Sequence, residues 1–334
     1  MTRKINNSYL LGQSNAPTTS GDMLKTRTDG TTVWEEVDGT GYMPPTWNGG
    51  RGLHGGGAAA PKDRIQYITI ASTGDATDFG DIVTGRENLG ALSNGSRGVF
   101  GGGEYNLTIE YITIASTGNT TDFGDLTGDF ATPSYNVSGC CNGTRGIFNG
   151  GHQSNSGDVL AYITVASTGN AIAFGALSVD RYYPAAVADS TRAISAGGTE
   201  PSKSNVIDYV AFDTTGDAVD FGNLTVARNK AGGMSDTTRG VFSDGEAGNT
   251  SISTIDYITI QTTGNATDFG NRTANDMYGS GDCSNGTRGV IMGGTGDAGG
   301  VNVMDYITIQ STGNATDFGD LLNVQGYGAG CAGD

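Results

Sequence analysis

Only a few residue types in this chain could carry chemistry, and their spacing limits what each can do. The 334 residues include two histidines and four cysteines. His54 and His152 lie in different repeats, and neither has a partner at the spacing of a nucleophile–base pair or a metal site. No Cys-x-x-Cys pair or Cys/His cluster is present. The sequence therefore predicts a protein that is not an enzyme and that has no metal site and no cofactor.

Three of the cysteines fall at one repeated position. Counted back from the arginine of each repeat, that position holds six small or medium apolar side chains: Leu92, Cys140, Val187, Met234, Cys283 and Cys331. Free cysteine behaves as a small buried hydrophobe in such a place. We therefore expect core positions here and no disulfide framework.

Six arginines head apolar segments at equivalent positions: Arg51, Arg97, Arg145, Arg192, Arg239 and Arg288. A guanidinium suits bidentate pairing with a carboxylate. We expect a structural arginine ring in which each member pairs with the aspartate before the repeated phenylalanine: Asp78, Asp122, Asp220, Asp268 and Asp317. Ala173 interrupts this pattern in one repeat.

The acidic and amide side chains of segments such as Gly74–Asp78 could be interpreted as calcium ligands. A calcium site needs six to eight oxygen ligands, and these segments lack the spacing of an EF-hand loop. We interpret these side chains as solvated turn residues.

The turn acids and amides lie in a 14-residue segment that occurs six times. The copies begin at Tyr67, Tyr111, Tyr162, Tyr209, Tyr257 and Tyr306, 44 to 51 residues apart. Self-similarity at such a period is typical of propellers and repeat arrays. Each copy alternates apolar and polar residues, turns at a glycine and ends in Phe-Gly or its equivalent, which predicts two short antiparallel strands.

Two further strands complete each repeat: one led by the arginine and one of small residues before it. Four strands in six units predict an all-β fold, a six-bladed β-propeller of four-stranded blades over residues 47–334. The first unit begins at its second strand, with Arg51, and the chain ends in the first-strand pattern Gly330-Cys331-Ala332. We therefore expect the C-terminal strand to close the ring and remove its open edges.

Residues 1–46 lie outside the repeat. Gly21–Lys25 and Asp29–Glu35 predict a short N-terminal β arm around an Asp-Gly turn, followed by a linker that ends at Pro45. The segment is too small to bury a core of its own. We expect it to be a docking arm that attaches the propeller to a partner, with Leu24, Val33 and Trp34 as its contacts.

The net charge of −17 excludes several partners. Acidic surfaces repel nucleic acid phosphates and anionic bilayers, so we expect no nucleic acid partner. No apolar run reaches the roughly 18 residues that span a bilayer, and the N-terminus lacks the apolar stretch of a secretory signal. We expect no membrane insertion.

The glycine pair after the second strand (Gly101-Gly102, Gly293-Gly294) and the tyrosine of the third resemble kelch repeats across residues 47–334. Kelch units usually carry a tryptophan in the fourth strand, where this chain has phenylalanine. The repeats look more specifically like the Gly/Thr-rich propeller arrays of virion proteins from marine tailed phages. The segment GDMLKTRTDGTTVWEEV resembles attachment segments of phage tail and fibre proteins. These resemblances imply a structural or host-recognition protein of the virion, on a tail, fibre or capsid surface.

The connections between strands differ between the two faces of such a disc. Turns between first and second and between third and fourth strands are nearly uniform, whereas the other two connections vary. Variable loops on a rigid scaffold are where recognition usually resides. Aromatic residues in or beside them are candidates for stacking on sugars or docking a protein: Tyr105, Phe130, Tyr135, Tyr182, Tyr183, Tyr278 and Tyr327.

Together these features predict a tail- or fibre-associated virion protein. Its residues 1–46 would bind other virion proteins, and its propeller would recognise a host-surface glycan or receptor. Two alternatives remain open: a decoration protein without receptor binding, and a cellular surface interaction propeller. The resemblance to tail fibres implies a homo-oligomer, with trimeric and sixfold arrangements both open.

Overall fold

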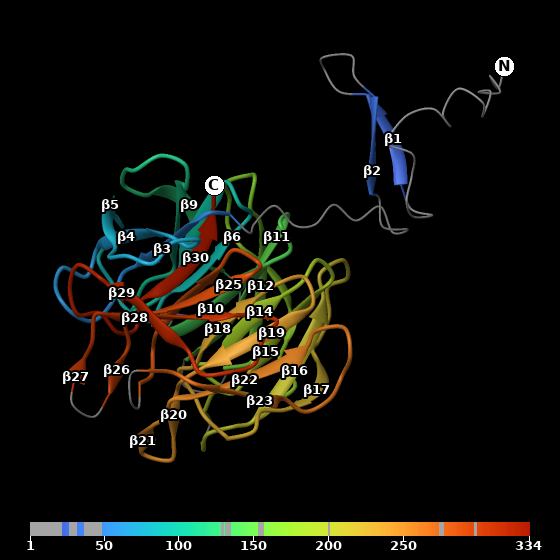
Figure 1. Cartoon of the computed structure of the whole chain (residues 1–334). Helices are drawn as coiled ribbons and strands as arrows, with labels where there is room; N and C mark the ends of the chain where they lie inside the picture. Colours follow the sequence, from blue (N-terminus) through green and yellow to red (C-terminus); the bar gives the residue numbers. More distant parts are fainter. Residues whose placement is uncertain are drawn as a thin grey trace. The chain divides into compact units, whose positions relative to one another are not determined.

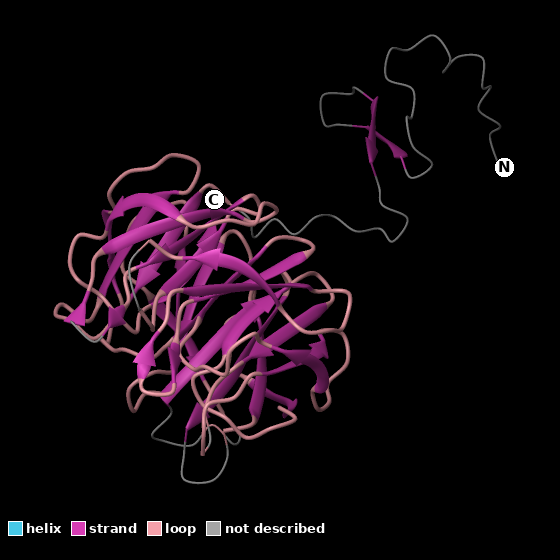
Figure 2. Ribbon diagram, turned by 60° about the horizontal axis from the view of Figure 1, so that its bottom comes forward, coloured by secondary structure: helices cyan, strands magenta, loops and turns pink. Residues whose placement is uncertain are grey.

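The computed structural model consists of strands and their connections, with no helix in the part of the chain that it describes (Figure 2). It describes residues 22–26, 32–36, 49–127, 130, 135–152, 157–199, 201–273, 277–296 and 299–334, and gives the backbone alone for 22–26, 32–36, 135, 136 and 152. Two compact units, Met1–Pro44 and Pro45–Asp334, make up the chain.

The larger unit is a six-bladed propeller of antiparallel four-stranded sheets (Figure 1). Blade 1 contains β30 (Ala329–Gly333), β3 (Arg51–Gly55), β4 (Arg64–Thr69) and β5 (Thr77–Asp81). Blade 2 contains β6 (Gly90–Ser93), β7 (Arg97–Gly101), β8 (Thr108–Thr113) and β9 (Thr121–Asp125). Blade 3 contains β10 (Tyr135–Cys141), β11 (Arg145–His152), β12 (Val159–Thr164) and β13 (Ile172–Ala176).

The other three blades follow the same order, innermost strand first. Blade 4 contains β14 (Ala185–Ala188), β15 (Arg192–Ala196), β16 (Val206–Ala211) and β17 (Val219–Asn223). Blade 5 contains β18 (Gly232–Ser235), β19 (Arg239–Ser243), β22 (Thr254–Thr259) and β23 (Thr267–Asn271). Blade 6 contains β24 (Gly281–Ser284), β25 (Arg288–Met292), β28 (Val303–Thr308) and β29 (Thr316–Asp320).

Two short hairpins project from second-to-third connections. They are formed by β20 (Glu246–Ala247) with β21 (Thr250–Ser251), and by β26 (Thr295–Gly296) with β27 (Gly299–Gly300). In the smaller unit, β1 (Asp22–Thr26) pairs with β2 (Thr32–Glu36), and Leu24 lies opposite Trp34. The side chains of Leu24, Val33 and Trp34 and the linker up to Pro45 lie outside the described residues.

The two ends of the propeller sequence close the ring in one sheet, as the sequence predicts. Strand β30 pairs antiparallel with β3, with Cys331 opposite Leu53. In Figure 1 the red C-terminal strand lies beside the blue strands of blade 1. The innermost strands contact one another around the ring in the order β30, β6, β10, β14, β18 and β24. The innermost strand of every blade therefore contacts the innermost strands of both neighbouring blades.

The core lies between the blades. The position shared by Leu92, Cys140 and its equivalents is buried in all six blades, and all four cysteines are free thiols. Each repeated tyrosine packs edge-on against the repeated phenylalanine, with ring centroids 5.9 to 6.1 Å apart. The third and fourth strands shift register beside this phenylalanine, as at Ile65/Gln66. Both expectations for these positions, buried hydrophobes and paired strands, are confirmed.

Neighbouring blades meet main chain to main chain at their outer strands. The Gly118 N–H of blade 2 donates to Phe79 O of blade 1 over 2.8 Å, and all six interfaces repeat this bond. A Cβ atom on Gly80 would lie 2.2 Å from Gly118 O. Because no side-chain atom fits there, the Phe-Gly pair of each repeat is required by the blade that follows it.

The turn acids and amides have a role in the same interface. Asn119 Oδ1 accepts the Asp81 N–H of the preceding blade at 3.0 Å, and Asp75 Oδ1 accepts the Asp320 N–H at 3.0 Å. Corresponding bonds occur at the other four interfaces. The interpretation of these side chains as solvated turn residues is therefore incomplete: they are exposed, but they also join the blades.

Gly175→Ala tests this constraint without adding backbone strain, because the φ of Gly175 is not positive. The new Cβ would lie 2.1 Å from Gly216 O, so blades 3 and 4 must separate. We expect a loss of about 1–3 kcal/mol in the free energy of unfolding, measured by urea denaturation. Gly50→Ala is the control, because the φ of Gly50 is also not positive and the new Cβ would meet only the Asp334 side chain, at 3.1 Å. An equal loss in both variants would contradict the close-approach argument.

Candidate functional site: the tyrosine cluster at the channel mouth

The second-to-third and fourth-to-first connections form one face of the propeller, called here the variable-loop face. The central channel opens on this face. Five residues at its mouth each lie two residues before the innermost strand of a blade: Asn88, Tyr183, Lys230, Gly279 and Tyr327. Main-chain hydrogen bonds connect them across blades, from Asn88 N–H to Tyr327 O, Tyr327 N–H to Gly279 O, Gly279 N–H to Lys230 O and Lys230 N–H to Tyr183 O. These bonds, 2.7 to 3.1 Å long, fix the shape of the mouth.

All five mouth residues have a left-handed backbone. Their φ angles lie between 57° and 68°. Glycine, as at position 279, adopts this conformation at little cost, and asparagine tolerates it better than most residues. For Tyr183, Lys230 and Tyr327 it costs about 1–2 kcal/mol each. The fold holds three large side chains where a glycine would be less strained.

Four tyrosines from three blades gather at this mouth, and we call them the tyrosine cluster: Tyr182, Tyr183, Tyr278 and Tyr327. The rings of Tyr182 and Tyr183 lie 5.5 Å apart, and those of Tyr278 and Tyr327 lie 5.8 Å apart. All four side chains are half-buried. Burial raises the pKa of Tyr278 and of Tyr327 above the ordinary value.

Lys230 connects the two halves of the cluster. Its Nζ lies 5.1, 4.5 and 5.5 Å from the ring centroids of Tyr183, Tyr278 and Tyr327. It also pairs with Glu246 Oε2 at 2.9 Å, while Lys203 pairs with Oε1 of the same carboxylate at 2.7 Å. Burial raises the pKa of Glu246, but the hydrogen bonds from Lys203 and Lys230 outweigh it and the pKa falls below the ordinary value. Glu246 therefore stays ionised, and the network holds the rings in place.

Sequence reasoning found the four tyrosines of the cluster but not the residues that fix them. Lys203, Lys230 and Glu246 are ordinary charged residues of variable loops, and no spacing pattern marks them. They become a network only because blades 4 and 5 are neighbours and the β20–β21 hairpin of blade 5 extends toward blade 4. Lys203 of blade 4 also donates a hydrogen bond to Gly248 O in this hairpin.

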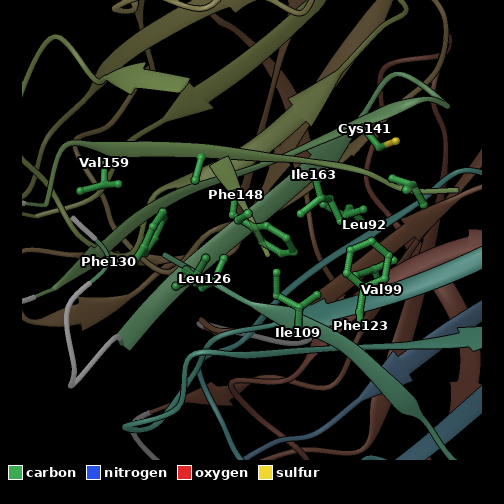
Figure 3. Close-up of a cluster of buried hydrophobic side chains, with 14 residues drawn as sticks. Leu92, Val99, Ile109, Phe123, Leu126, Phe130, Cys141, Phe148, Val159 and Ile163 are labelled. Carbon is green, nitrogen blue, oxygen red and sulfur yellow. The ribbon is translucent and has the colours of Figure 1, made fainter. Parts of the chain in front are cut away.

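The other three aromatic candidates lie elsewhere. Tyr105 is 66% exposed in the second-to-third connection of blade 2. Phe130 is buried in the apolar cluster with Leu126, Phe148 and Val159 (Figure 3), so its prediction as a surface ligand-binding residue is wrong. Tyr135 begins β10, and its side chain lies outside the described residues.

The six arginines form a closed ring, but their partners differ from those expected. Each guanidinium lies over the tyrosine of its own blade, 4.1 to 4.7 Å from the ring centroid. It donates to a main-chain carbonyl of the next blade, as Arg239 does to Ile309 O at 2.8 Å and Arg288 to Ile70 O at 3.1 Å. The expected pairing with Asp78 and its equivalents is wrong for the described residues, because those carboxylates lie on exposed outer strands.

A second set of arginines, which sequence reasoning missed, anchors the fourth-to-first connections. Arg86, Arg181, Arg228 and Arg272 are almost fully buried and pair with Glu110, Asp208, Asp256 and Asp305 over 2.8 to 3.1 Å. Each acid directly precedes the repeated tyrosine. The signal available in the sequence was an acidic residue inside the predicted third strand, directly before the repeated tyrosine.

The two blades without this ion pair change both members together. In blade 3 the acid is replaced by Ala161 and the arginine by Phe130, and both belong to one apolar cluster. In blade 1 the two positions hold Gln66 and Gln325; Gln66 Oε1 accepts the Leu322 N–H at 2.6 Å. This joint replacement explains why Phe130 is in the core: it fills the space of a buried arginine.

Of the two histidines, His54 is the one whose side chain the structure describes. His54 is fully buried in β3, and burial lowers its pKa from 6.5 to about 4. The described residues contain no group of three or more His, Cys, Asp or Glu arranged to hold a metal ion. They also contain no helix long and apolar enough to cross a membrane. Neither protein-family models nor curated proteins gave a match to this chain.

Arg228→Met removes one partner of a buried ion pair. The Asp256 carboxylate then stays buried without its counter-charge, and we expect a loss of about 3–5 kcal/mol in the free energy of unfolding, measured by urea denaturation. The double variant Arg228→Phe/Asp256→Ala copies the combination at Phe130 and Ala161, so it should lose clearly less. If single and double variants lose equally, the buried charge is not the cause.

His54→Phe tests the effect of a buried neutral imidazole. Phe100, Phe148 and Phe242 occupy the equivalent strand position. Because the pKa of His54 falls to about 4 in the folded state, the unfolded chain binds an extra proton between about pH 6.5 and 4. As the pH is lowered from about 6.5 to 4, the free energy of unfolding of the parent protein should therefore decrease, and that of His54→Phe should decrease less steeply. Parallel curves of melting temperature against pH would contradict this assignment.

Proposed function

We propose that this chain is a non-enzymatic protein of a phage virion that recognises the host surface. Residues 1–46 attach it to another virion protein, and the propeller presents its variable-loop face outward. The observation that carries the proposal is the tyrosine cluster at the channel mouth, on the face whose described loops differ from blade to blade. A recognition site is expected where variable loops meet a fixed scaffold.

The contrast between the two faces supports this orientation. The opposite face repeats the arginine ring and the glycine turns almost unchanged in every blade, so it has little that could distinguish ligands. All three lysines of residues 47–334 (Lys62, Lys203 and Lys230) lie in connections of the variable-loop face. Exposed aspartates such as Asp78, Asp122 and Asp268 lie instead on the outer strands. Each of these lysines pairs with a glutamate of the same face, so the two faces are distinguished by the variety of their side chains and not by a free positive charge.

The virion assignment itself rests on the resemblance of the repeats and of the N-terminal segment to phage proteins. The strongly acidic composition suits a protein present at high local concentration, because like charges keep copies soluble.

Decoration of the particle is the second candidate, and one observation favours it. The first position of the fourth strand is threonine in four blades, but Ile172 and Val219 occupy it in the neighbouring blades 3 and 4 and are 57% and 56% exposed. Two aliphatic side chains on adjacent outer strands suit a contact with another virion subunit. This contact is compatible with recognition at the mouth.

The proposal predicts that the purified full chain, fluorescently labelled, binds intact host cells in a saturable manner. Val219→Thr, which restores the residue of four other blades, should leave this binding unchanged because it lies away from the mouth. Tyr183→Ala combined with Tyr327→Ala should reduce it strongly. Absence of saturable binding by the parent chain would overturn recognition and leave decoration as the function.

A further inference from the structure

We propose that the tyrosine cluster is a subsite for one neutral pyranose residue of a host-surface glycan. This inference rests on the recognition role proposed above and names the chemistry of its ligand. The sugar ring stacks on tyrosine faces at the channel mouth, and its hydroxyls meet the polar wall of the hollow behind them.

Backbone strain indicates that the side chains of the mouth serve more than folding. Tyr183, Lys230 and Tyr327 have a left-handed φ near 60°, while Gly279 takes the same position in the chain of main-chain hydrogen bonds before blade 6. The fold therefore needs the backbone conformation but not the side chain. Strain of this kind that persists in large residues is concentrated at functional sites.

Contacts within the protein hold the side chains of the cluster. Tyr183, Tyr278 and Tyr327 surround the Lys230 ammonium, which Glu246 holds in turn. Binding normally costs conformational entropy when side chains become ordered, and here these contacts order the side chains in the free protein. Tyrosine adds a large apolar face and a hydroxyl with few rotatable bonds. A pre-ordered aromatic surface of this size fits a single sugar ring.

The hollow at the mouth has the chemistry of a carbohydrate site rather than a peptide site. Its walls are formed by Tyr183, Lys230, Tyr327, Ser280, Asp282 and the glycine-rich innermost strands. Leu89, Val137 and Pro184 are the larger aliphatic residues of the wall, and most of the remaining lining is glycine, alanine, polar residues and tyrosine. A pyranose has an apolar face beside a rim of hydroxyls, which matches ring faces next to serine, aspartate and main-chain groups.

The charge of the site favours a neutral sugar over an acidic one. Lys230 and Lys203 both pair with Glu246, and their side chains are only 15% and 16% exposed. Their ammonium groups are therefore engaged and poorly placed to receive a carboxylate from solution. The buried Asp282 carboxyl in the wall accepts a hydrogen bond from the Ser243 hydroxyl and offers no positive charge to an anionic ligand.

The test uses the full chain and polysaccharide extracted from the host cell surface. In saturation-transfer difference NMR we expect transfer to the protons of a neutral sugar residue, and this polysaccharide should compete with cells for the labelled protein. Tyr183→Ala and Tyr327→Ala should each weaken binding by about tenfold or more. Tyr278→Phe should bind nearly as well as the parent, because the ring remains. Val219→Thr is the control, and thermal melting checks that every variant is folded.

Further outcomes separate this inference from the proposed function. If cells bind the protein equally well after periodate oxidation of their sugars, the sugar subsite is wrong while recognition stands. If only acidic residues of the polysaccharide receive saturation transfer, the neutral sugar is wrong. Competition experiments with the parent chain need no variant, so a variant that fails to fold does not weaken the test. If cells do not bind at all, the proposed function fails, and the NMR result alone decides whether the mouth binds sugar.

Discussion

The close approach of main chains between neighbouring blades is the constraint on which the rest of this structure depends. At each interface a Phe-Gly pair of one blade meets the glycine turn of the next, with space for no Cβ atom. The hydrogen bonds made there, together with the arginine that crosses to the next blade, repeat six times and return to their start. Ring closure through β30 and β3 then joins the two ends of the propeller sequence within blade 1.

This repeated interface leaves the other face free to vary. The loops of the variable-loop face are anchored below their exposed tips by a buried pair beneath each connection. That pair is ionic in four blades, apolar in blade 3 and formed by glutamines in blade 1. Three chemistries occupy the same place, and in each of them the two residues change together. Loop tips could therefore diverge without loss of the scaffold.

The mouth of the channel combines both properties. Four main-chain hydrogen bonds of one kind connect its backbone from blade to blade, whereas its side chains differ between blades. Large residues in a strained conformation, fixed by a lysine between tyrosine rings, are concentrated on one part of the ring. Such local irregularity on a symmetric frame is what distinguishes this site from the arginine ring, whose members are nearly identical and serve the fold.

The sequence by itself determined the number of blades, their strand order, the closure by the C-terminal strand and the buried slot that Cys140, Cys283 and Cys331 share. Each of these follows from periodicity, because a sequence repeat shows the features that all blades share. Tertiary structure decided the partners of the arginine ring, the buried place of Phe130 and the network of Lys203, Lys230 and Glu246. These depend on which segments face each other across blades, and a contact between residues far apart in sequence leaves no periodic trace in a single chain.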